Sequence, residues 1–500
     1  MNTKAELQRL AIGALHEVTD DISLPDYMPE IERIVSCTSS LLPESRYIDS
    51  GELVLSGIAI VCIYYIGGTG ELCAFPHNCE YSVKLSCAGS DLSELSADDL
   101  VVKSSIESTQ CRAVGPRKFS LDLKMRSFVF ASHTDSLDFE TTSSDGTECT
   151  LADSVALELR RGEFEYTALR CATGSGSASG EIRERDGVRI ISCEGTAAIF
   201  SATPSASRVA LKGELYISCL AKDGDGVYST VRIKAPIEEN LTLSSPNAED
   251  SRSWAVGRAR CASVKMHGGD GGEFTWEAEY DVEAFVFSEC ACDLALDAYS
   301  SAYESETELS RTRIVKCLAG TNSRLSTNAS KQLVRATGTE VVYFTAKASQ
   351  ERSECTSDGK LVIGGTCAVT AILANDDAVT SEDILIPYRF ECDCKSSTNA
   401  SIVSDVTPIG VDGRLDGDRL VVNCELAVSC FALEGEERNY LKEIKLRRDE
   451  PLCRSRSELT LYYPTTDEET WDIGKRYHCP ISRVRRIDSS GCVIIVGCSD

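Results

Sequence analysis

Cysteine is the residue type that most strongly suggests chemistry in this chain, because 24 of the 500 residues are cysteines. Structural zinc sites usually combine two CxxC-type pairs at short range. The close pairs here are Cys290-Ala291-Cys292 and Cys392-Asp393-Cys394, and both lie in strand-like sequence. Residues i and i+2 of a strand share a face, so each pair could present two thiols to one neighbour. The spacing therefore predicts no zinc site.

The redox state of these thiols depends on where the chain is made. The first residues do not form a signal peptide, because Glu6, Arg9 and His16 interrupt the apolar sequence, so we expect synthesis in a reducing cytoplasm. Most thiols would then stay unpaired, many as small buried hydrophobes. Cysteines near turns or in polar sequence could form disulfides between chains, rather than within one, in an oxidising shell. These are Cys73, Cys79, Cys149, Cys171, Cys479 and Cys498.

Other residue patterns do not predict catalysis. None of the five histidines lies beside a nucleophile elbow or in a zinc-protease helix pattern. Gly67–Gly70 lacks the Lys-Ser/Thr of a phosphate-binding loop and predicts a hairpin turn. Asp223–Gly226 and Gly268–Gly272 suggest calcium, but the ligand series of an EF-hand is missing, so we interpret both as turns. We expect a non-enzymatic protein without cofactor or metal.

Composition narrows the class of partners. The chain carries 51 basic and 78 acidic residues, a net charge of −27, which argues against nonspecific nucleic-acid binding because that requires neutralising phosphates. Residues 438–486 are an exception, with 12 basic and 8 acidic side chains. No apolar run approaches the ~20 residues that span a bilayer, so we expect no transmembrane segment.

The elements that must position these residues repeat along the chain. Four stretches are variations on one strand: Val54–Ile66, Ala210–Lys222, Val362–Ala374 and Val421–Leu433. One column of their alignment holds Gly57, Gly213, Gly365 and Cys424. Each stretch leads to a turn and a second apolar strand, so each copy predicts a long hairpin. The recurrence indicates a string of similar β modules, with another backbone or bulky side chain close to each column glycine.

Helix is expected mainly at the ends of the chain. Residues up to about Val18 have an amphipathic helical pattern that the proline of Asp21–Asp26 ends. Near the C-terminus, Glu469–Tyr477 and Ile481–Ile487 predict two short helices. Strands Leu459–Tyr463 and Cys492–Val496 flank these helices, giving a small βααβ module.

The polar stretch Thr134–Asp153 predicts a first linker, and the domain borders follow from it and from the repeats. The expected domains are residues 1–133, holding the N-terminal helix and a first β module, then 151–306, 309–451 and the terminal module 455–500.

Several segments match the motifs of one family. Asp21–Ile34, with the sequence DISLPDYMPEIERI, is similar to the opening D-I-x-L-P-D-x-x-P-D-I-x-R-I of the SPOCS-domain family of endospore-forming bacteria. Val114–Leu121 resembles the R-K-x-S strand of that family, and Leu296–Ser300 resembles its D-A-Y-S segment. The hairpins at the column glycines resemble its G-E-L-x-V-x-x-L-Y core. The resemblance covers most of residues 20–450 and implies β modules of spore-coat assembly proteins.

The C-terminal module has a resemblance of its own. Glu469–Tyr477 is similar to the first helix, T-L-W-D-I-A-K-K-Y, of a LysM module, a βααβ fold. The usual Gly-Asp before that helix is replaced by Asp467-Glu468, the Asn after the second helix is missing beside Asp488, and the next loop is short. LysM modules bind N-acetylglucosamine polymers through those loops. The combination of the two families resembles a clostridial coat-morphogenetic protein that docks a coat-forming ATPase, which implies protein contact instead.

These observations lead to a mainly β fold of tandem antiparallel modules followed by a degenerate LysM-like module. We expect a structural scaffold that is made in the mother-cell cytoplasm and ends in the spore coat or on the forespore surface. Its partners would be other coat proteins, a coat-forming ATPase among them, and homo-oligomers stay open. The alternative is binding of peptidoglycan or cortex glycan. The expected partner-binding residues are Trp471, Lys475, Arg476, Arg483 and Arg486, with Arg485 beside them on a different face.

Overall fold

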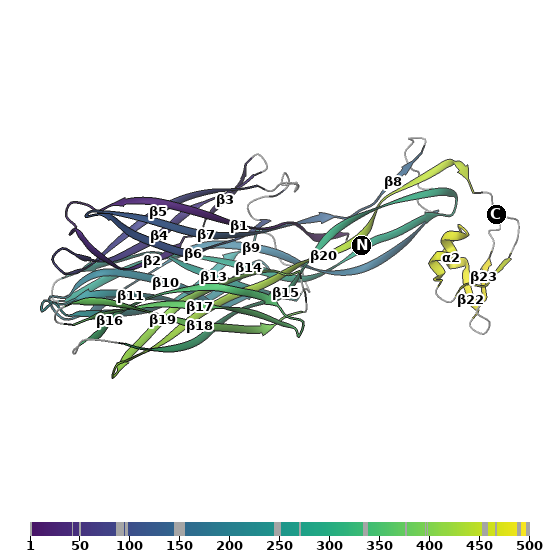
Figure 1. Ribbon diagram of the computed structural model, residues 1–500. Helices are drawn as coiled ribbons and strands as arrows, with labels where there is room; N and C mark the ends of the chain where they lie inside the picture. The colour runs from purple at the N-terminus through teal and green to yellow at the C-terminus, as the bar shows by residue number, and fades with distance from the viewer. Residues whose placement is uncertain are drawn as a thin grey trace.

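The protein consists mainly of β-strands, in agreement with the predicted fold class, and forms an elongated body from which long hairpins extend toward a small C-terminal unit (Figure 1). The sheets are antiparallel apart from one short parallel pair. The computed structural model describes residues 3–42, 44–49, 52–86, 95, 99–144, 156–244, 252–269, 272–333, 339–375, 378–395, 397, 399–452, 459–465, 468–487 and 492–496.

The N-terminal segment is a strand, so the predicted helix is wrong. β1 (Lys4–Ser23) pairs antiparallel with β7 (Lys118–Ser136) over its whole length. The strand is more stable than the helix here, because an isolated helix of this length is marginal in water. Pairing of β1 with β7 instead provides hydrogen bonds for the backbone groups along both strands. The predicted linker Thr134–Asp153 also contains the end of β7 and a short strand, β8 (Glu140–Ser143), and residues 145–155 lie outside the described residues.

Three consecutive segments fold with the same six-stranded topology, and we call them unit 1 (residues 4–136), unit 2 (157–300) and unit 3 (303–451). In each unit the second, third and fourth strands form one sheet around the third strand. The first, fifth and sixth strands form the other sheet around the sixth. Unit 1 contains β1, β2 (Ile31–Leu41), β4 (Glu52–Gly67), β5 (Leu72–Ser86), β6 (Leu100–Gly115) and β7, with β3 (Ser45–Asp49) continuing β2 along β4.

The other two units follow the same order. Unit 2 contains β9 (Leu157–Arg183), β10 (Arg189–Pro204), β11 (Arg208–Lys222), β12 (Tyr228–Thr242), β13 (Ser253–Gly268) and β14 (Glu273–Ser300). Unit 3 contains β15 (Tyr303–Gln332), β16 (Glu340–Cys355), β17 (Lys360–Ala374), β18 (Val379–Asp393), β19 (Ser401–Asp416) and β20 (Arg419–Pro451). A single pairing, Leu7 with Ile314, joins β1 to β15 and makes one sheet continuous between units 1 and 3.

The four repeated stretches are all central strands of their sheets. Three of them lie in β4, β11 and β17, the third strand of each unit, as expected for equivalent hairpins. The fourth, Val421–Leu433, lies in β20 and is the centre of the other sheet of unit 3. The turn expected at Glu434–Glu436 is wrong, because β20 continues to Pro451 while pairing with β15. The repeated sequence is therefore the sequence of a strand that pairs on both sides. A central strand needs a similar pattern of apolar side chains in either sheet.

The column glycines lie where a side chain would collide with a neighbour, as predicted. A Cβ on Gly213 would lie 2.1 Å from the carbonyl oxygen of Ala198, and one on Gly365 would lie 2.0 Å from that of Ser349. In both units the second strand has a β-bulge at this level. In unit 1, Gly57 faces the Tyr81 ring. The glycine is thus required by a close backbone approach in units 2 and 3 and by an aromatic side chain in unit 1.

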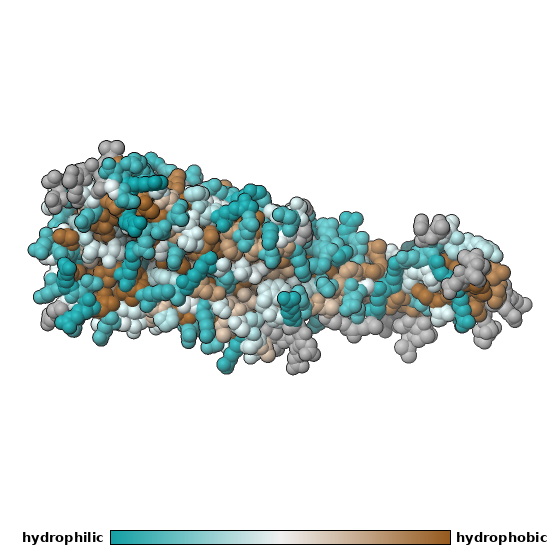
Figure 2. Space-filling model, turned by 90° about the horizontal axis from the view of Figure 1, so that it is seen from below, coloured by the Kyte–Doolittle hydropathy of each residue, from teal (hydrophilic) through white to brown (hydrophobic). Residues whose placement is uncertain are grey.

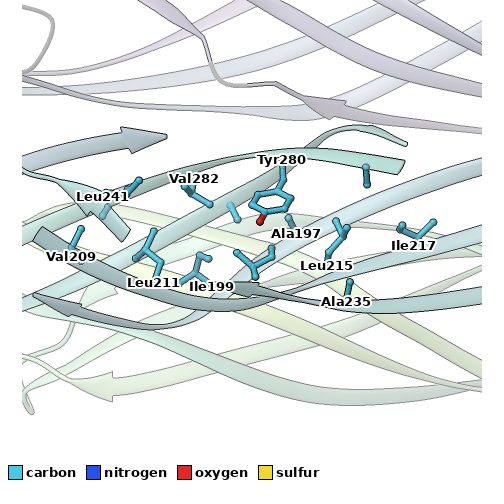
Figure 3. Packing of buried hydrophobic residues seen from close by; sticks show 14 of the residues in the cluster. Ala197, Ile199, Val209, Leu211, Leu215, Ile217, Ala235, Leu241, Tyr280 and Val282 are labelled. Carbon is cyan, nitrogen blue, oxygen red and sulfur yellow. The ribbon is translucent and has the colours of Figure 1, made fainter. Parts of the chain in front are cut away.

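Each unit has a core between its two sheets, seen most clearly in unit 2 (Figure 3). Alternating residues of β11 point inward from one sheet, and Tyr280 and Val282 of β14 face them from the other. The inward residues of β11 are Val209, Leu211, Leu215 and Ile217. Burying the inward face of a central strand removes apolar area from water, at roughly 25 cal/mol per Å².

The three units close into a ring in which equivalent residues meet. The second strand of each unit lies beside the fourth strand of a neighbour: β2 beside β18, β10 beside β5, and β16 beside β12. One cluster at the centre joins three equivalent cross-strand pairs, one from each unit. They are Val101 with Phe130, Val256 with Phe285, and Val403 with Phe431. Each unit contacts one neighbour through its second strand and the other neighbour through its fourth strand. The interface is heterologous and closes after three units, so no strand of this kind is left to bind a fourth unit.

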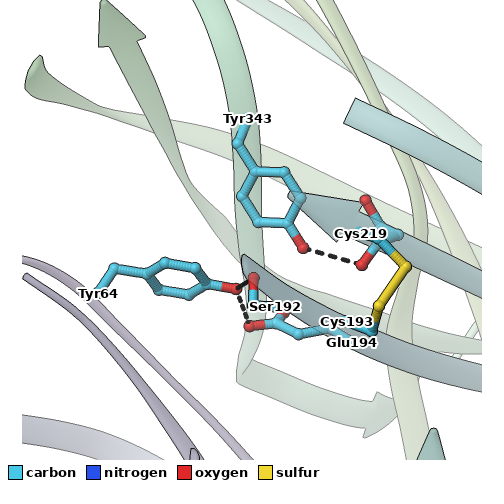
Figure 4. The surroundings of a disulfide bond; sticks show 7 residues. Tyr64, Ser192, Cys193, Glu194, Cys219 and Tyr343 are labelled. Carbon is cyan, nitrogen blue, oxygen red and sulfur yellow. Dashed lines mark hydrogen bonds between the residues drawn. A yellow bond between two sulfur atoms is a disulfide. The ribbon is translucent and has the colours of Figure 1, made fainter. Parts of the chain in front are cut away.

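Polar groups also meet between the units. The carboxylate Oε1 of Glu194 on β10 accepts a hydrogen bond from Tyr64 of unit 1 at 2.7 Å (Figure 4). It accepts a second one from Thr38 at 2.8 Å. Burial raises the pKa of Glu194, although both hydrogen bonds act against that shift. Beside it, Cys193 and Cys219 are a directly opposed pair of β10 and β11, with Cα atoms 4.1 Å apart, and form a disulfide. This bond lies within one chain, against the expectation that cross-links form between chains rather than within one. The expectation of mostly unpaired thiols agrees with the other described cysteines; Cys149 and Cys498 lie outside the described residues.

Candidate functional site

The C-terminal unit (residues 459–496) holds all the predicted partner-binding residues. It contains β21 (Leu459–Tyr462), α2 (Thr470–Arg476), the 3-10 turn η3 (Ile481–Arg483), β22 (Val484–Ile487) and β23 (Cys492–Val496). α2 agrees with the first predicted helix, and a capping box between Glu469 and Asp472 begins it. Its last turn carries Lys475 and Arg476, which complement the helix dipole.

The second predicted helix, Ile481–Ile487, is wrong. Only Ile481–Arg483 forms a short 3-10 turn, after which β22 pairs antiparallel with β23. In a strand, successive side chains alternate between the two faces of the sheet. Arg483 and Arg486, three residues apart, therefore do not share the helical face that was expected for them. The unit is therefore a three-stranded sheet in the order β21-β23-β22 with one α-helix among its described residues.

Two of the predicted binding residues are already engaged within the chain. Asp297 of β14 accepts a hydrogen bond from Trp471 Nε1 at 2.9 Å, and Lys475 Nζ lies 2.7 Å from both oxygens of the same carboxylate. Trp471 is only 6% exposed. Arg160 of β9 adds an ion pair with Glu469 at 2.7 Å. One face of α2 is thus fixed on the extended end of unit 2.

Tyr299 completes this docking contact. Its ring packs edge-on against Trp471 with centroids 5.1 Å apart, and its hydroxyl donates to the carbonyl oxygen of Cys479 at 2.6 Å. Burial raises the pKa of Tyr299, which keeps the phenol protonated as a donor. Gly474 lies opposite, where a Cβ would be 2.6 Å from that hydroxyl. Asp297 and Tyr299 belong to the Leu296–Ser300 segment that the sequence marked as a motif, but its contact with the C-terminal unit was not predicted.

The arginines of the unit are mainly used to hold its own loop. Arg476 forms an ion pair with Glu468 at 2.6 Å and also contacts the Tyr462 hydroxyl. Arg486 donates to the backbone carbonyl of Glu468. Arg483 is half-buried, whereas Arg485 is exposed on the other face of β22. The predicted cationic surface is therefore not continuous: Arg476 and Arg486 bond within the unit, and Arg485 is exposed on another face.

An exposed apolar surface lies on the opposite side of the unit, and sequence reasoning missed it. Leu459 and Leu461 of β21 and the following Tyr463 are 52%, 58% and 70% exposed. Leu461, Ile494 and Arg485 are aligned across the three strands, and Val496 pairs with Leu459. We call Leu459, Leu461, Tyr463, Ile494, Val496 and Arg485 the outer face. Apolar residues gather at this end of the molecule in Figure 2, and the alternation of Leu459–Tyr463 is the signal that could have located them.

A second candidate is a cavity of about 540 Å³ between units 1 and 2, lined by charges of both signs. Arg258 is buried and bonds Glu283 at 2.5 Å, while Arg46 lies 3.5 Å from the same carboxylate. Lys103 and Asp405, at positions equivalent to Arg258 in units 1 and 3, belong to the same network. Burial lowers the pKa of Lys103 to about 8. These opposite charges come from all three units, so their pairing links the units electrostatically.

Comparisons of the chain with protein-family models, with curated proteins and with solved structures found no match. In the part of the chain that the structure describes, no cluster of three or more His, Cys, Asp or Glu residues has the geometry to hold a metal ion. Among the same residues, none of the helices is long and apolar enough to cross a membrane.

Proposed function

We propose that this protein is a structural scaffold of the bacterial spore coat, in which the three-unit body is one attachment point and the C-terminal unit recruits a coat protein such as a coat-forming ATPase. The observation that carries the proposal is the position of the outer face. It lies at the far end of an elongated molecule, on a unit whose opposite side is fixed to Asp297.

Two properties of the outer face support recruitment of a protein. Exposed apolar residues that gather on one small sheet are typical of protein contacts. Arg485 contributes a cation to the outer face in a chain that is otherwise strongly acidic, so a partner with an apolar segment and a nearby carboxylate would fit. The engaged side of α2 does not compete, because Trp471 and Lys475 are used within the chain.

The alternative, binding of cortex glycan, has less support. A sugar platform needs an exposed aromatic face, and Trp471 is buried against Tyr299. Pulldown of the full chain on insoluble peptidoglycan separates the two functions. We expect no retention, and retention that soluble glycan fragments compete away would favour glycan binding over the scaffold.

Affinity capture from sporulating cells tests the recruiting role. We expect Leu461→Asp with Arg485→Glu to lose the captured coat protein by at least tenfold, because it charges the apolar surface and reverses its cation. Arg483→Glu with Arg486→Glu serves as the matched control on the same unit. Loss with the control pair and retention with the first pair would place recruitment on the basic residues. Retention in both would place recruitment on the body.

A further inference from the structure

Four thiols gather at one edge of unit 3. Cys355 is the last residue of β16, Cys392 lies in β18, Cys394 follows it, and Cys430 lies in β20 of the other sheet. Cys355 and Cys392 both pair with Leu361, from opposite sides of β17. The Sγ atoms of Cys355 and Cys394 are 3.2 Å apart. Cys392 packs against the buried cluster of unit 3 that contains Cys430, and the two thiols interact closely enough to shift each other's pKa. The Cys392-Asp393-Cys394 pair thus offers two thiols on one strand face, as its spacing allows.

The sulfurs of Cys355 and Cys394 are close to bonding distance. A disulfide requires about 2.05 Å between sulfurs, so the Cys355 and Cys394 sulfurs need to move by only about 1 Å. A bond between Cys392 and Cys430 would join β18 to β20 and therefore connect the two sheets. A bond between Cys355 and Cys394 would join the two outer strands of one sheet across the start of β17. Unit 2 already contains a disulfide between neighbouring strands, Cys193–Cys219.

We propose that Cys392 with Cys430 and Cys355 with Cys394 form two intrachain disulfides when the protein meets a small-molecule disulfide, and that the first bond staples the sheets of unit 3 together. The proposal is independent of the scaffold function, because it rests only on the position of the thiols.

The two thiols of the inter-sheet pair have different roles. Cys392 is half-buried, so an oxidant can reach it, while Cys430 is fully buried. The hydrogen bond from the Cys430 thiol lowers the pKa of Cys392, and the same bond together with burial raises the pKa of Cys430. Because Cys392 is the accessible member of the pair, it is the attacking thiolate and Cys430 the resolving thiol.

The exchange balances without any further reagent. The Cys392 thiolate attacks one sulfur of the small disulfide, the disulfide bond breaks, and the released thiolate takes up the proton that Cys392 lost. Cys430 then attacks the Cys392 sulfur of the mixed disulfide and displaces the second small thiolate, which takes the proton of Cys430. The two protein thiols lose two electrons, and the small disulfide is reduced to two thiols.

The chain contains an internal control in the same unit. Cys367 of β17 and Cys424 of β20 have Sγ atoms 3.5 Å apart, similar to the pair at the edge. Both are fully buried, so a small disulfide cannot reach either sulfur in the folded protein. If access to an attacking thiolate decides the reaction, this pair stays reduced while the edge pairs oxidise.

The test exposes the reduced full chain to oxidised glutathione, alkylates the remaining thiols and maps the peptides by mass spectrometry. We expect linked peptides for Cys392–Cys430 and Cys355–Cys394, with Cys367 and Cys424 alkylated only after unfolding. In Cys430→Ser, glutathione should accumulate on Cys392 at least tenfold above the wild type, because the resolving thiol is missing. Cys424→Ser is the matched control, which should oxidise like the wild type.

Three results would overturn the proposal. Oxidation of Cys367–Cys424 at the rate of the edge pairs would remove the role of access. Links mainly between chains would show that these thiols act in assembly. Protection of all four thiols by one equivalent of zinc would make the edge a metal site. Wild-type mapping decides the matter even if Cys430→Ser fails to fold.

Discussion

Glu194 is a carboxylate that the packing of the units forces into an unfavourable place. It is buried where units 1 and 2 meet, and its two recorded donors are neutral hydroxyls of unit 1, Tyr64 and Thr38. Hydrogen bonds from hydroxyls offset part of the cost of desolvation, but a carboxylate without a cation still favours its neutral form. This explains the raised pKa of the group.

We expect Glu194→Gln to raise stability at pH 7. A group whose pKa is raised on folding stabilises the protein below its unfolded pKa and loses that contribution as pH rises through the folded value. The advantage of the glutamine variant should therefore vanish near and below pH 4.5, the ordinary value of the group, and grow above it. Urea unfolding from pH 4 to pH 8 measures this, with exposed Glu238→Gln as control. If the stability difference between the variant and the wild type does not change with pH, Glu194 ionises in the folded protein with its ordinary pKa, and the expectation is wrong.

At the scale of strands, the column glycines are the residues of the repeat that the strand arrangement requires. Their close contacts are with main-chain oxygens of a bulge in units 2 and 3, and a main-chain atom cannot rotate away as a side chain can. A larger residue would have to displace the bulge or the central strand.

Gly213→Ala and Gly365→Ala should each destabilise the protein by about 1–3 kcal/mol, the usual cost of overpacking. Urea unfolding is the measurement. Gly68→Ala in the turn after β4 is the control, because a Cβ there meets nothing within 4 Å, and it should change stability by less than about 0.5 kcal/mol. If all three variants change the free energy of unfolding equally, the cause is the changed backbone entropy of the unfolded chain and not the close contact.

The docking of α2 on β14 depends on a single carboxylate. Asp297→Ala should weaken the contact by about 1–3 kcal/mol, because it leaves Trp471 Nε1 and Lys475 without their shared acceptor. The rate of amine labelling at Lys475, followed by mass spectrometry, reports the undocked population and should rise. Asp293→Ala on the same strand is the control. An unchanged rate would assign the contact to the packing of Tyr299.

At the scale of the whole molecule, the closed ring predicts that the units depend on one another. Phe431 of unit 3 contacts the rings of Phe285 and Phe287 of unit 2, with centroids 4.9 and 5.2 Å apart. The equivalent Phe130 of unit 1 belongs to the same cluster. Stability of any one unit therefore includes apolar area that the other two bury.

Phe431→Ala should cost about 3–5 kcal/mol and should speed amide hydrogen exchange in β7 and β14 as well as in β20. Phe344→Ala, in the core of unit 3 itself, is the control and should change exchange within unit 3 only. If Phe431→Ala left β7 and β14 unaffected, the units would be independent domains.

The sequence by itself determined the local elements of this protein. The repeated strands, the column glycines, α2 and the two strands of the C-terminal unit have periods, caps and turns that short segments encode. The helix predicted for β1 failed for the complementary reason. Its residues pair with residues of β7 that are 95 to 132 positions away, and no local pattern encodes that pairing.

Only the tertiary structure decided which residues meet. Trp471 and Lys475 were expected to face a partner, but Asp297, 174 and 178 positions away, takes both. The same holds for Cys392 and Cys430, whose strands belong to different sheets, and for the phenylalanines at the centre of the ring. Side-chain period tells which face of a strand is buried, but the partner across that face is set by how sheets and units pack, and that information is spread over the whole chain.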